Sequence, residues 1–67
     1  MNIPKFKATC VEKKISRNEL CFIWKCSPQT ASKKRNGRTP ITLDEAQRFS
    51  EYANLTDTEK AIIFLGD

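Results

Sequence analysis

The amino-acid sequence predicts an all-α domain, a compact bundle of five short helices. Three observations favour this fold class. A chain of 67 residues has room for one small domain with one hydrophobic core. Ser or Thr followed three residues later by Glu, a pattern that begins helices, recurs along the chain. No segment shows the alternation of apolar and polar residues that is typical of a strand.

Each of the first three helices has a start signal. Pro4 opens the first, because its fixed backbone geometry suits the first turn of a helix. Ser16 and Glu19 precede the second as a capping box, in which a hydroxyl and a carboxylate bind otherwise unpaired backbone N–H groups. Ser27 before Pro28 marks the third. The five predicted helices cover about residues 4–14, 17–24, 28–35, 43–53 and 57–65.

The last two helices begin at two further capping boxes, Thr42 with Glu45 and Thr56 with Glu59. The segment 36–40, Asn-Gly-Arg-Thr-Pro, separates the third helix from the fourth. Its glycine readily adopts the left-handed conformation that ends a helix, and its proline disfavours continuation. Residues 1–67 are therefore expected to form a single domain.

Apolar residues at helical spacing give most of the helices a side that faces a core. The candidate core residues are Phe6, Cys10, Ile15, Leu20, Ile23, Trp24, Cys26, Ala31, Ile41, Leu43, Ala46, Phe49, Ala53, Leu55 and residues 61–65. The third helix is the exception, because it offers only Ala31 to the core, helped by the aliphatic stem of Lys34. Its remaining polar positions are well explained if the outer face of the helix meets a polar partner.

Charge is distributed unevenly along the chain. Residues 1–40 carry ten Lys and Arg against two acidic residues, a net charge of +8, whereas residues 41–67 carry two against six, a net charge of −4. Such a chain presents one basic face to a polyanion and keeps its acidic part away from it. A solvated, lysine-rich surface explains the same charges without a partner, so charge alone favours nucleic acid only weakly.

The three cysteines, Cys10, Cys21 and Cys26, favour a structural role in a reducing cytoplasm. Their number is odd, and without a Cys-x-x-Cys pair or a histidine they indicate neither a disulfide framework nor a zinc site. No histidine and no glycine-rich phosphate loop is present, and carboxylates serve as caps, so we expect no enzyme, catalytic residue, metal or cofactor. No apolar run is long enough to span a bilayer, and residues 1–10 do not resemble a signal peptide.

Residues 6–40 resemble the helix-turn-helix of the lambda-repressor-like family, which includes Cro and the phage repressors. The motifs that carry the resemblance are Ile15-Ser16-Arg17-Asn18-Glu19-Leu20 at the opening of the second helix, Cys21 at the helix crossing, Lys25-Cys26-Ser27 in the turn, and Asn36-Gly37 with Pro40 after the third helix. The fourth and fifth helices are similar to the tail of small Cro-like regulators from phages of Gram-positive bacteria. The resemblance implies a helix-turn-helix at about residues 17–35.

The sequence departs from the family pattern at several positions. Lys25 replaces the turn glycine, so a residue with a Cβ must take a positive φ at a cost of about 1 kcal/mol. Ala31 is smaller than the usual Ile or Val, and Trp24 is expected to fill the space. Cys10 and Arg35 stand where many relatives pair Arg with Glu, which leaves Arg35 to face solvent or phosphate.

The resemblance implies a sequence-specific regulator that binds double-stranded DNA, a Cro-type phage or prophage repressor with its third helix in the major groove. The implied base-reading residues are Pro28, Gln29, Ser32 and Lys33. Phosphate contacts are expected from Arg17, Ser27, Thr30, Asn36, Arg38 and Thr39, with Lys5, Lys7 and Lys34 as weaker candidates. A solvated helix face is the alternative for Gln29 and Lys33.

The resemblance also implies a homodimer on a near-palindromic operator, formed in solution or only on DNA. Residues 61–65 are apolar on every side, so we expect Ile63 and Phe64 to stay exposed on the monomer and to be covered by the partner. The alternative is that this helix closes the core. The expected location is the bacterial cytoplasm, with no membrane or small-molecule ligand. A protein-interaction module on the same fold, an antitoxin or a phage inhibitor of a host factor, remains open.

Overall fold

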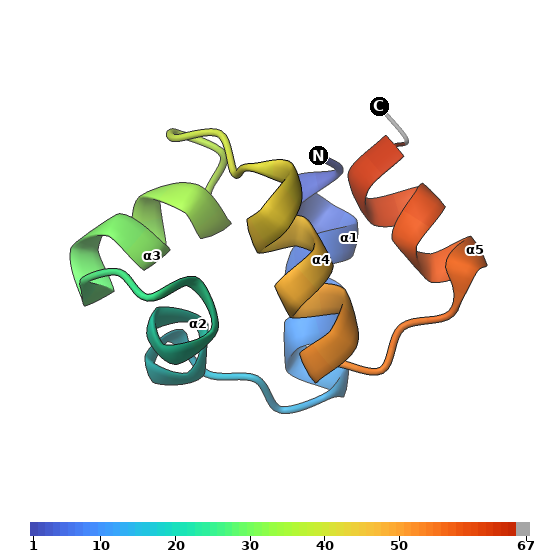
Figure 1. Cartoon of the computed structure of the whole chain (residues 1–67), viewed down its shortest axis with the longest axis horizontal. Helices are drawn as coiled ribbons and strands as arrows, with labels where there is room; N and C mark the ends of the chain where they lie inside the picture. Colours follow the sequence, from blue (N-terminus) through green and yellow to red (C-terminus); the bar gives the residue numbers. More distant parts are fainter. Residues whose placement is uncertain (66–67) are drawn as a thin grey trace.

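Five helical segments and a terminal π-helical turn form the bundle in the computed structural model, which describes residues 1–65. The elements are α1 (Ile3–Glu12), α2 (Arg17–Trp24), α3 (Pro28–Arg35), α4 (Leu43–Tyr52), α5 (Asp57–Lys60) and the π-helix η1 (Ala61–Leu65). In Figure 1, α2 and α3 lie on one side, α1 and α4 in the middle, and α5 with η1 on the other side. The predicted all-α fold class is confirmed, and α2 and α3 form the helix-turn-helix.

The predicted helix starts are confirmed, because the side chains before them bind the first free N–H groups. The N–H of Glu19 donates to Ser16 Oγ at 3.3 Å, and the N–H of Ser16 donates to Glu19 Oε1 at 3.3 Å. The capping boxes of α4 and α5 have the same reciprocal bonds. For α1 the cap is Asn2, whose Oδ1 accepts the N–H of Lys5 at 3.2 Å. The sequence did not predict this role for Asn2.

Four helices end at a residue in the left-handed conformation. These residues are Lys14, Lys25, Gly37 and Asn54, with φ of 56°, 51°, 78° and 55°. In each case the following N–H donates to a carbonyl five residues back, as Ile15 does to Cys10 O at 2.8 Å. The left-handed turn at Lys14 explains why α1 ends at Glu12, two residues before its predicted end. At Gly37 the positive φ favours glycine, and a Cβ would lie 3.0 Å from Ile3 Cδ1, so the Ile3 side chain would have to shift by a few tenths of an ångström to accept another residue.

The core is built around aromatic rings from α1, α2, α4 and η1. Phe6 of α1 lies with its ring centroid 4.7 Å from that of Phe49 in α4 and 5.8 Å from that of Trp24 in α2. Phe64 of η1 packs edge-on against Phe6 and Phe49. Trp24 also donates its indole Nε1–H to the carbonyl of Glu45 at 3.2 Å. These contacts connect α2 and η1 to the central pair of helices.

Burial differs from the sequence prediction at the start of α4 and at the end of the chain. Leu43, expected in the core, is 84% exposed, and Leu65 is 80% exposed. Ile63, expected to remain exposed on the monomer, is 0% exposed, and Phe64 is half-buried against the core. The reason is that η1 lies against α1: the N–H of Asn2 donates to Ile63 O at 2.7 Å. The expectation that Ile63 stays exposed on the monomer is therefore wrong, whereas Phe64 is only half-buried and its part in a contact between copies stays a prediction. The last helix closes the core.

No helix within residues 1–65 has the length and apolar character needed to cross a membrane.

Candidate nucleic-acid interface

The turn between α2 and α3 has the left-handed geometry that the sequence predicted. Lys25 has φ 51° and ψ 51°, and the N–H of Cys26 donates to Cys21 O at 3.1 Å, closing the end of α2. Ser27 then caps α3 by accepting the N–H of Thr30 at 3.2 Å. The connection between α2 and α3 is therefore only three residues long, 25–27. Such a short turn restricts how α3 crosses α2.

The four predicted base-reading residues lie on the outer side of α3. Ala31 is 0% exposed and faces the core, whereas Pro28, Gln29 and Lys33 are exposed and Ser32 is half-buried. With 3.6 residues per turn, positions 28, 29, 32 and 33 share one face of a helix. The structure therefore brings these residues together on one exposed surface.

Several predicted phosphate-binding groups already hydrogen-bond one another. The Ser27 hydroxyl donates to Thr30 Oγ1 at 3.0 Å, so Ser27 must break this bond to donate elsewhere, while Thr30 keeps its own proton. Asn36 Nδ2 donates to Ser32 O at 2.9 Å. Thr39, half-buried, follows in the loop after α3. These polar groups border the helix at its two ends.

Three of the predicted DNA-contacting side chains are cations without an acidic partner in the described residues. Arg17, Lys33 and Arg38 are all exposed, and none forms an ion pair with any residue in the described range 1–65. Arg17 is the first residue of α2, where the positive end of the helix dipole favours an anion. These three side chains are available to phosphate without first breaking an internal contact.

Lys34 is not free to contact phosphate, so its prediction as a weaker phosphate contact is wrong. Its ammonium group binds Glu45 Oε2, and its side chain is only 13% exposed. Burial by itself would raise the pKa of Glu45, but the hydrogen bonds from Lys34 and from the N–H of Thr42 hold that pKa below its ordinary value. This pair lies inside the bundle, between α3 and the start of α4.

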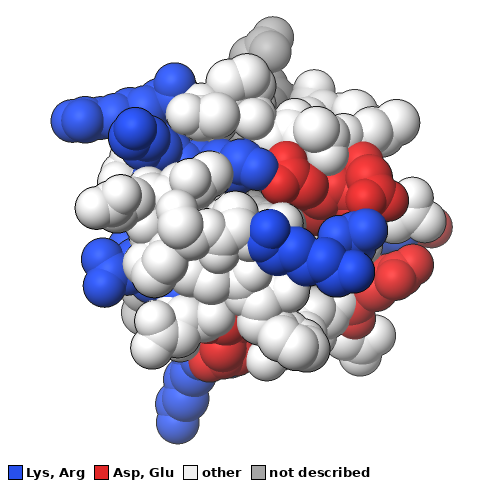
Figure 2. Space-filling view, turned by 60° about the vertical axis from the view of Figure 1, so that its left-hand side comes forward, with Lys and Arg blue, Asp and Glu red and all other residues white. Residues whose placement is uncertain are grey.

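The charges of this face are partly segregated. In Figure 2, which turns the side with α2 and α3 toward the reader, Lys and Arg side chains project along the left-hand and lower margins, and most Asp and Glu side chains lie to the right of centre, with one basic group among them. A polyanion approaching from the α3 side meets the basic margin first.

Burial raises the pKa of two thiols. The pKa of Cys10 rises to about 11, with the nearby Arg35 opposing the effect of burial, and the pKa of Cys26 is raised by burial as well. Both thiols stay protonated near neutral pH, which makes them poor nucleophiles. No cluster of three or more metal-ligating side chains occurs in the part of the chain that is described.

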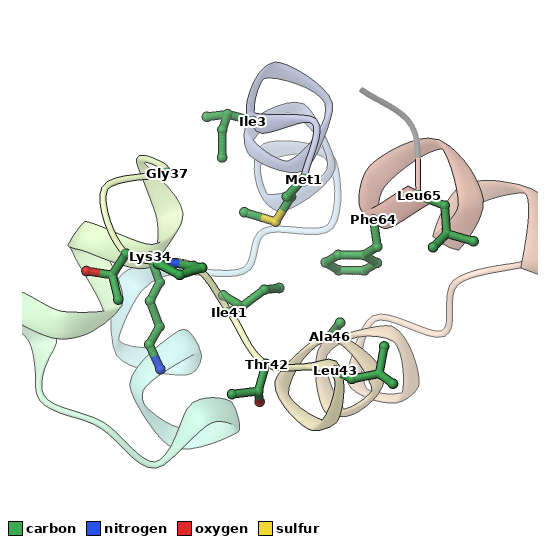
Figure 3. Close-up of a pocket in the computed structure, with 12 residues that line it drawn as sticks. Met1, Ile3, Lys34, Gly37, Ile41, Thr42, Leu43, Ala46, Phe64 and Leu65 are labelled. Carbon is green, nitrogen blue, oxygen red and sulfur yellow. The ribbon is translucent and has the colours of Figure 1, made fainter.

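Two apolar surfaces lie away from the outer face of α3. A groove of about 350 Å³ opens between the starts of α1 and α4, the loop after α3 and η1, with Met1, Ile3, Leu43, Phe64 and Leu65 among its lining residues. Figure 3 shows these side chains around one hollow. The second surface contains Phe22, 77% exposed, beside Tyr52, 48% exposed. Neither surface is predicted from the sequence, although Phe22 lies outside the apolar stripe of its helix.

Comparison of the chain with known proteins finds no matching family model, no similar curated protein and no similar solved structure. The resemblance to the lambda-repressor-like family stays a prediction from the residues of the motif.

Proposed function

We propose that this chain binds double-stranded DNA with α3 in the major groove and acts as a transcriptional regulator. The observation that carries the proposal is the composition of α3, in which only Ala31 is buried and the outer face presents Gln29, Ser32 and Lys33. A helix fits the width of the major groove, and side chains near its N-terminus reach base edges.

The exposed side chains suit the donors and acceptors of base pairs and phosphates. Gln29 has the amide group that binds adenine through two hydrogen bonds, and Lys33 has a cation for the O6 and N7 acceptors of guanine. Arg17 and Arg38 position the protein on the backbone through phosphates, which carry no sequence information. Occupation of an operator in this way blocks polymerase, the mode of action of a Cro-type repressor in the bacterial cytoplasm.

The proposal is tested by the salt dependence of binding to random-sequence duplex DNA. Each phosphate contact lowers the slope of log K against log salt by about 0.9, so a DNA-binding surface with several cations gives a steep negative slope. Binding that is absent at low salt, or present with no salt dependence, contradicts the proposal. Footprinting on the DNA that flanks the gene then locates a specific site.

Specific binding is expected to need two copies, because one small domain reads few base pairs. Two copies on a near-palindromic site place their reading helices about one helical turn of DNA apart. With Ile63 in the core, the apolar side chains that remain exposed in or beside η1 include Leu43, Ile62 and Leu65. These three are the candidate contacts between copies, in solution or only on DNA.

A protein-interaction module is the second candidate, and the exposed pair Phe22 and Tyr52 favours it. Large apolar side chains that are exposed together mark protein-binding surfaces. Replacement of Phe22 by Ser is expected to leave DNA binding unchanged if α3 is the functional surface. Loss of partner capture in this variant, together with shallow salt dependence on DNA, would favour the second candidate.

A further inference from the structure

Few directional contacts fix the rotation of α3 about its own axis. The buried side chain of this helix, Ala31, is small and makes no directional bond. The bonds at its two ends, from Thr30 N–H to Ser27 Oγ and from Arg38 N–H to Lys33 O, join α3 to its own turns and to no other helix. α3 packs against α2 and α1, but packing around one small side chain fixes the rotation of a helix less sharply than a directional bond does.

One directional contact reaches from α3 to another helix. The Lys34 ammonium binds Glu45 Oε2 in α4, and the two side chains are 13% and 11% exposed. The other ion pairs of residues 1–65 join neighbours within one helix and are far more exposed: Arg48 with Asp44, at 41% and 71%, and Lys60 with Asp57, at 44% and 104%. The Lys34–Glu45 pair is the one that links separate helices in the described part of the chain.

Glu45 also accepts two other hydrogen bonds. Its Oε1 accepts the N–H of Thr42 at 2.9 Å, and its carbonyl accepts the indole N–H of Trp24 at 3.2 Å. These bonds hold the backbone of Glu45 to α2 and its carboxylate to the N-terminus of α4. Figure 3 shows the Lys34 side chain extending from α3 toward the start of α4, where Thr42 lies.

We infer that Glu45 is a positioning residue for α3: through Lys34 it sets the rotation of the helix and so the direction in which Gln29 and Lys33 point. With 3.6 residues per turn, Lys34 lies beside Ala31 on the inner side, while Gln29 and Lys33 lie one turn apart on the outer side. Two apolar side chains of similar volume would also fill this space, but without a preferred direction. The inference deepens the proposed function and rests on it for its effect on DNA.

The variant that separates positioning from stability is Lys34→Met with Glu45→Gln. Methionine keeps the stem of Lys34, and glutamine keeps an oxygen that accepts the N–H of Thr42. No buried charge is left unpaired, so the double variant is expected to stay folded. The directional contact is lost. The matched control is Arg48→Gln, which removes an exposed ion pair of the same helix.

Two measurements are made on each folded variant. Residual dipolar couplings of backbone amides report the orientation of α3 relative to α4, and they are expected to change in the double variant and not in the control. The second measurement is the ratio of affinities for a duplex that the wild type selects from a random pool and for random duplex. We expect this ratio to fall about tenfold in the double variant, the effect of losing about one base contact.

Each result decides a separate question. Unchanged couplings in the folded double variant overturn the inference, and so does an unchanged affinity ratio when the couplings have moved. If the wild type selects no duplex, the proposed function fails and its link to Glu45 fails with it. The couplings then still show whether Glu45 orients α3.

Discussion

Gln29 and Lys33 lie four residues apart, one turn of α3, and both are exposed beside the buried Ala31. We expect Gln29→Ala and Lys33→Ala each to weaken binding to a selected duplex by about 1–3 kcal/mol and binding to random duplex much less, because base contacts carry the specificity. Arg17→Ala is the matched comparison: it is expected to weaken both alike and to reduce the salt slope by about one unit. The measurement is a titration of labelled duplex at several salt concentrations. Equal losses on both duplexes for Gln29→Ala would assign α3 a role other than base reading.

Lys25 is a second residue whose effect follows from its own backbone. Its φ of 51° costs a side chain with a Cβ about 1 kcal/mol, which glycine avoids while losing more entropy on folding. We therefore expect Lys25→Gly to be neutral or to stabilise the fold by up to about 1 kcal/mol in urea unfolding. Lys14→Gly, at φ 56°, is the parallel case. Gly in place of Lys7, within α1, is expected to destabilise by about 1 kcal/mol. A clear loss of stability in Lys25→Gly would mean that this side chain makes a contact worth more than the strain.

At the scale of the helices, the features that the sequence predicted are local ones. Capping boxes and a proline at a helix start depend on residues within four positions of each other, so the starts at Ser16, Ser27 and Thr42 are confirmed. The Lys34–Glu45 pair joins residues eleven apart across two helices, and no local pattern marks it. The outer face of α3 was predictable because its helix offers the core so little.

The burial of side chains in η1 is another feature that local sequence patterns do not predict. Every residue of η1 is apolar, so spacing cannot say which of Ile62, Ile63 and Leu65 turns inward. It is Ile63 that turns inward, in a segment held against the N-terminal residues by the bond from Asn2 N–H to Ile63 O. The π-helical winding of Ala61–Leu65 changes the angular spacing of these side chains as well, and it was not predicted.

The lowered pKa of Glu45 gives the α3–α4 contact a pH signature. A carboxylate with a lowered pKa in the folded state adds stability that is present above its ordinary pKa of 4.5 and is lost as the pH falls through the folded value. At neutral pH we expect the free energy of unfolding of the wild type to exceed that of the Glu45→Gln variant by about 1–3 kcal/mol. The difference should shrink below pH 4.5. Urea unfolding of both proteins across this range measures it. Hydrogen bonds also lower the pKa values of Glu19 and Glu59. These two groups titrate in both proteins, so their contributions cancel in the difference between the two free energies of unfolding. A difference that does not vary with pH would mean that the charge of Glu45 does not stabilise the fold.

At the scale of the whole molecule, the burial of Ile63 moves the expected contact between copies to the side chains near η1 that stay exposed. We expect Leu65→Asp, at an 80% exposed position, to leave the monomer folded and to prevent two copies from occupying one selected duplex. Ile63→Asp is the contrasting variant: at 0% exposure it places a charge in the core and should unfold the protein. Sedimentation with and without the duplex gives the number of chains per DNA. Two chains of Leu65→Asp bound as tightly as wild type would exclude this surface, and one wild-type chain at saturation would exclude the dimer.

Trp24 is the one tryptophan of the chain, and its ring lies in the core between α1 and α4 with its N–H bound to Glu45 O. An indole in such surroundings emits at shorter wavelength than one in water. Intrinsic fluorescence excited beyond the absorption of tyrosine therefore reports from the junction of three helices without any label. A shift to longer wavelength on unfolding would follow the whole domain, while a smaller change in the folded protein would follow the contact between α2 and the start of α4. The groups proposed to meet DNA stay chemically untouched while they are tested.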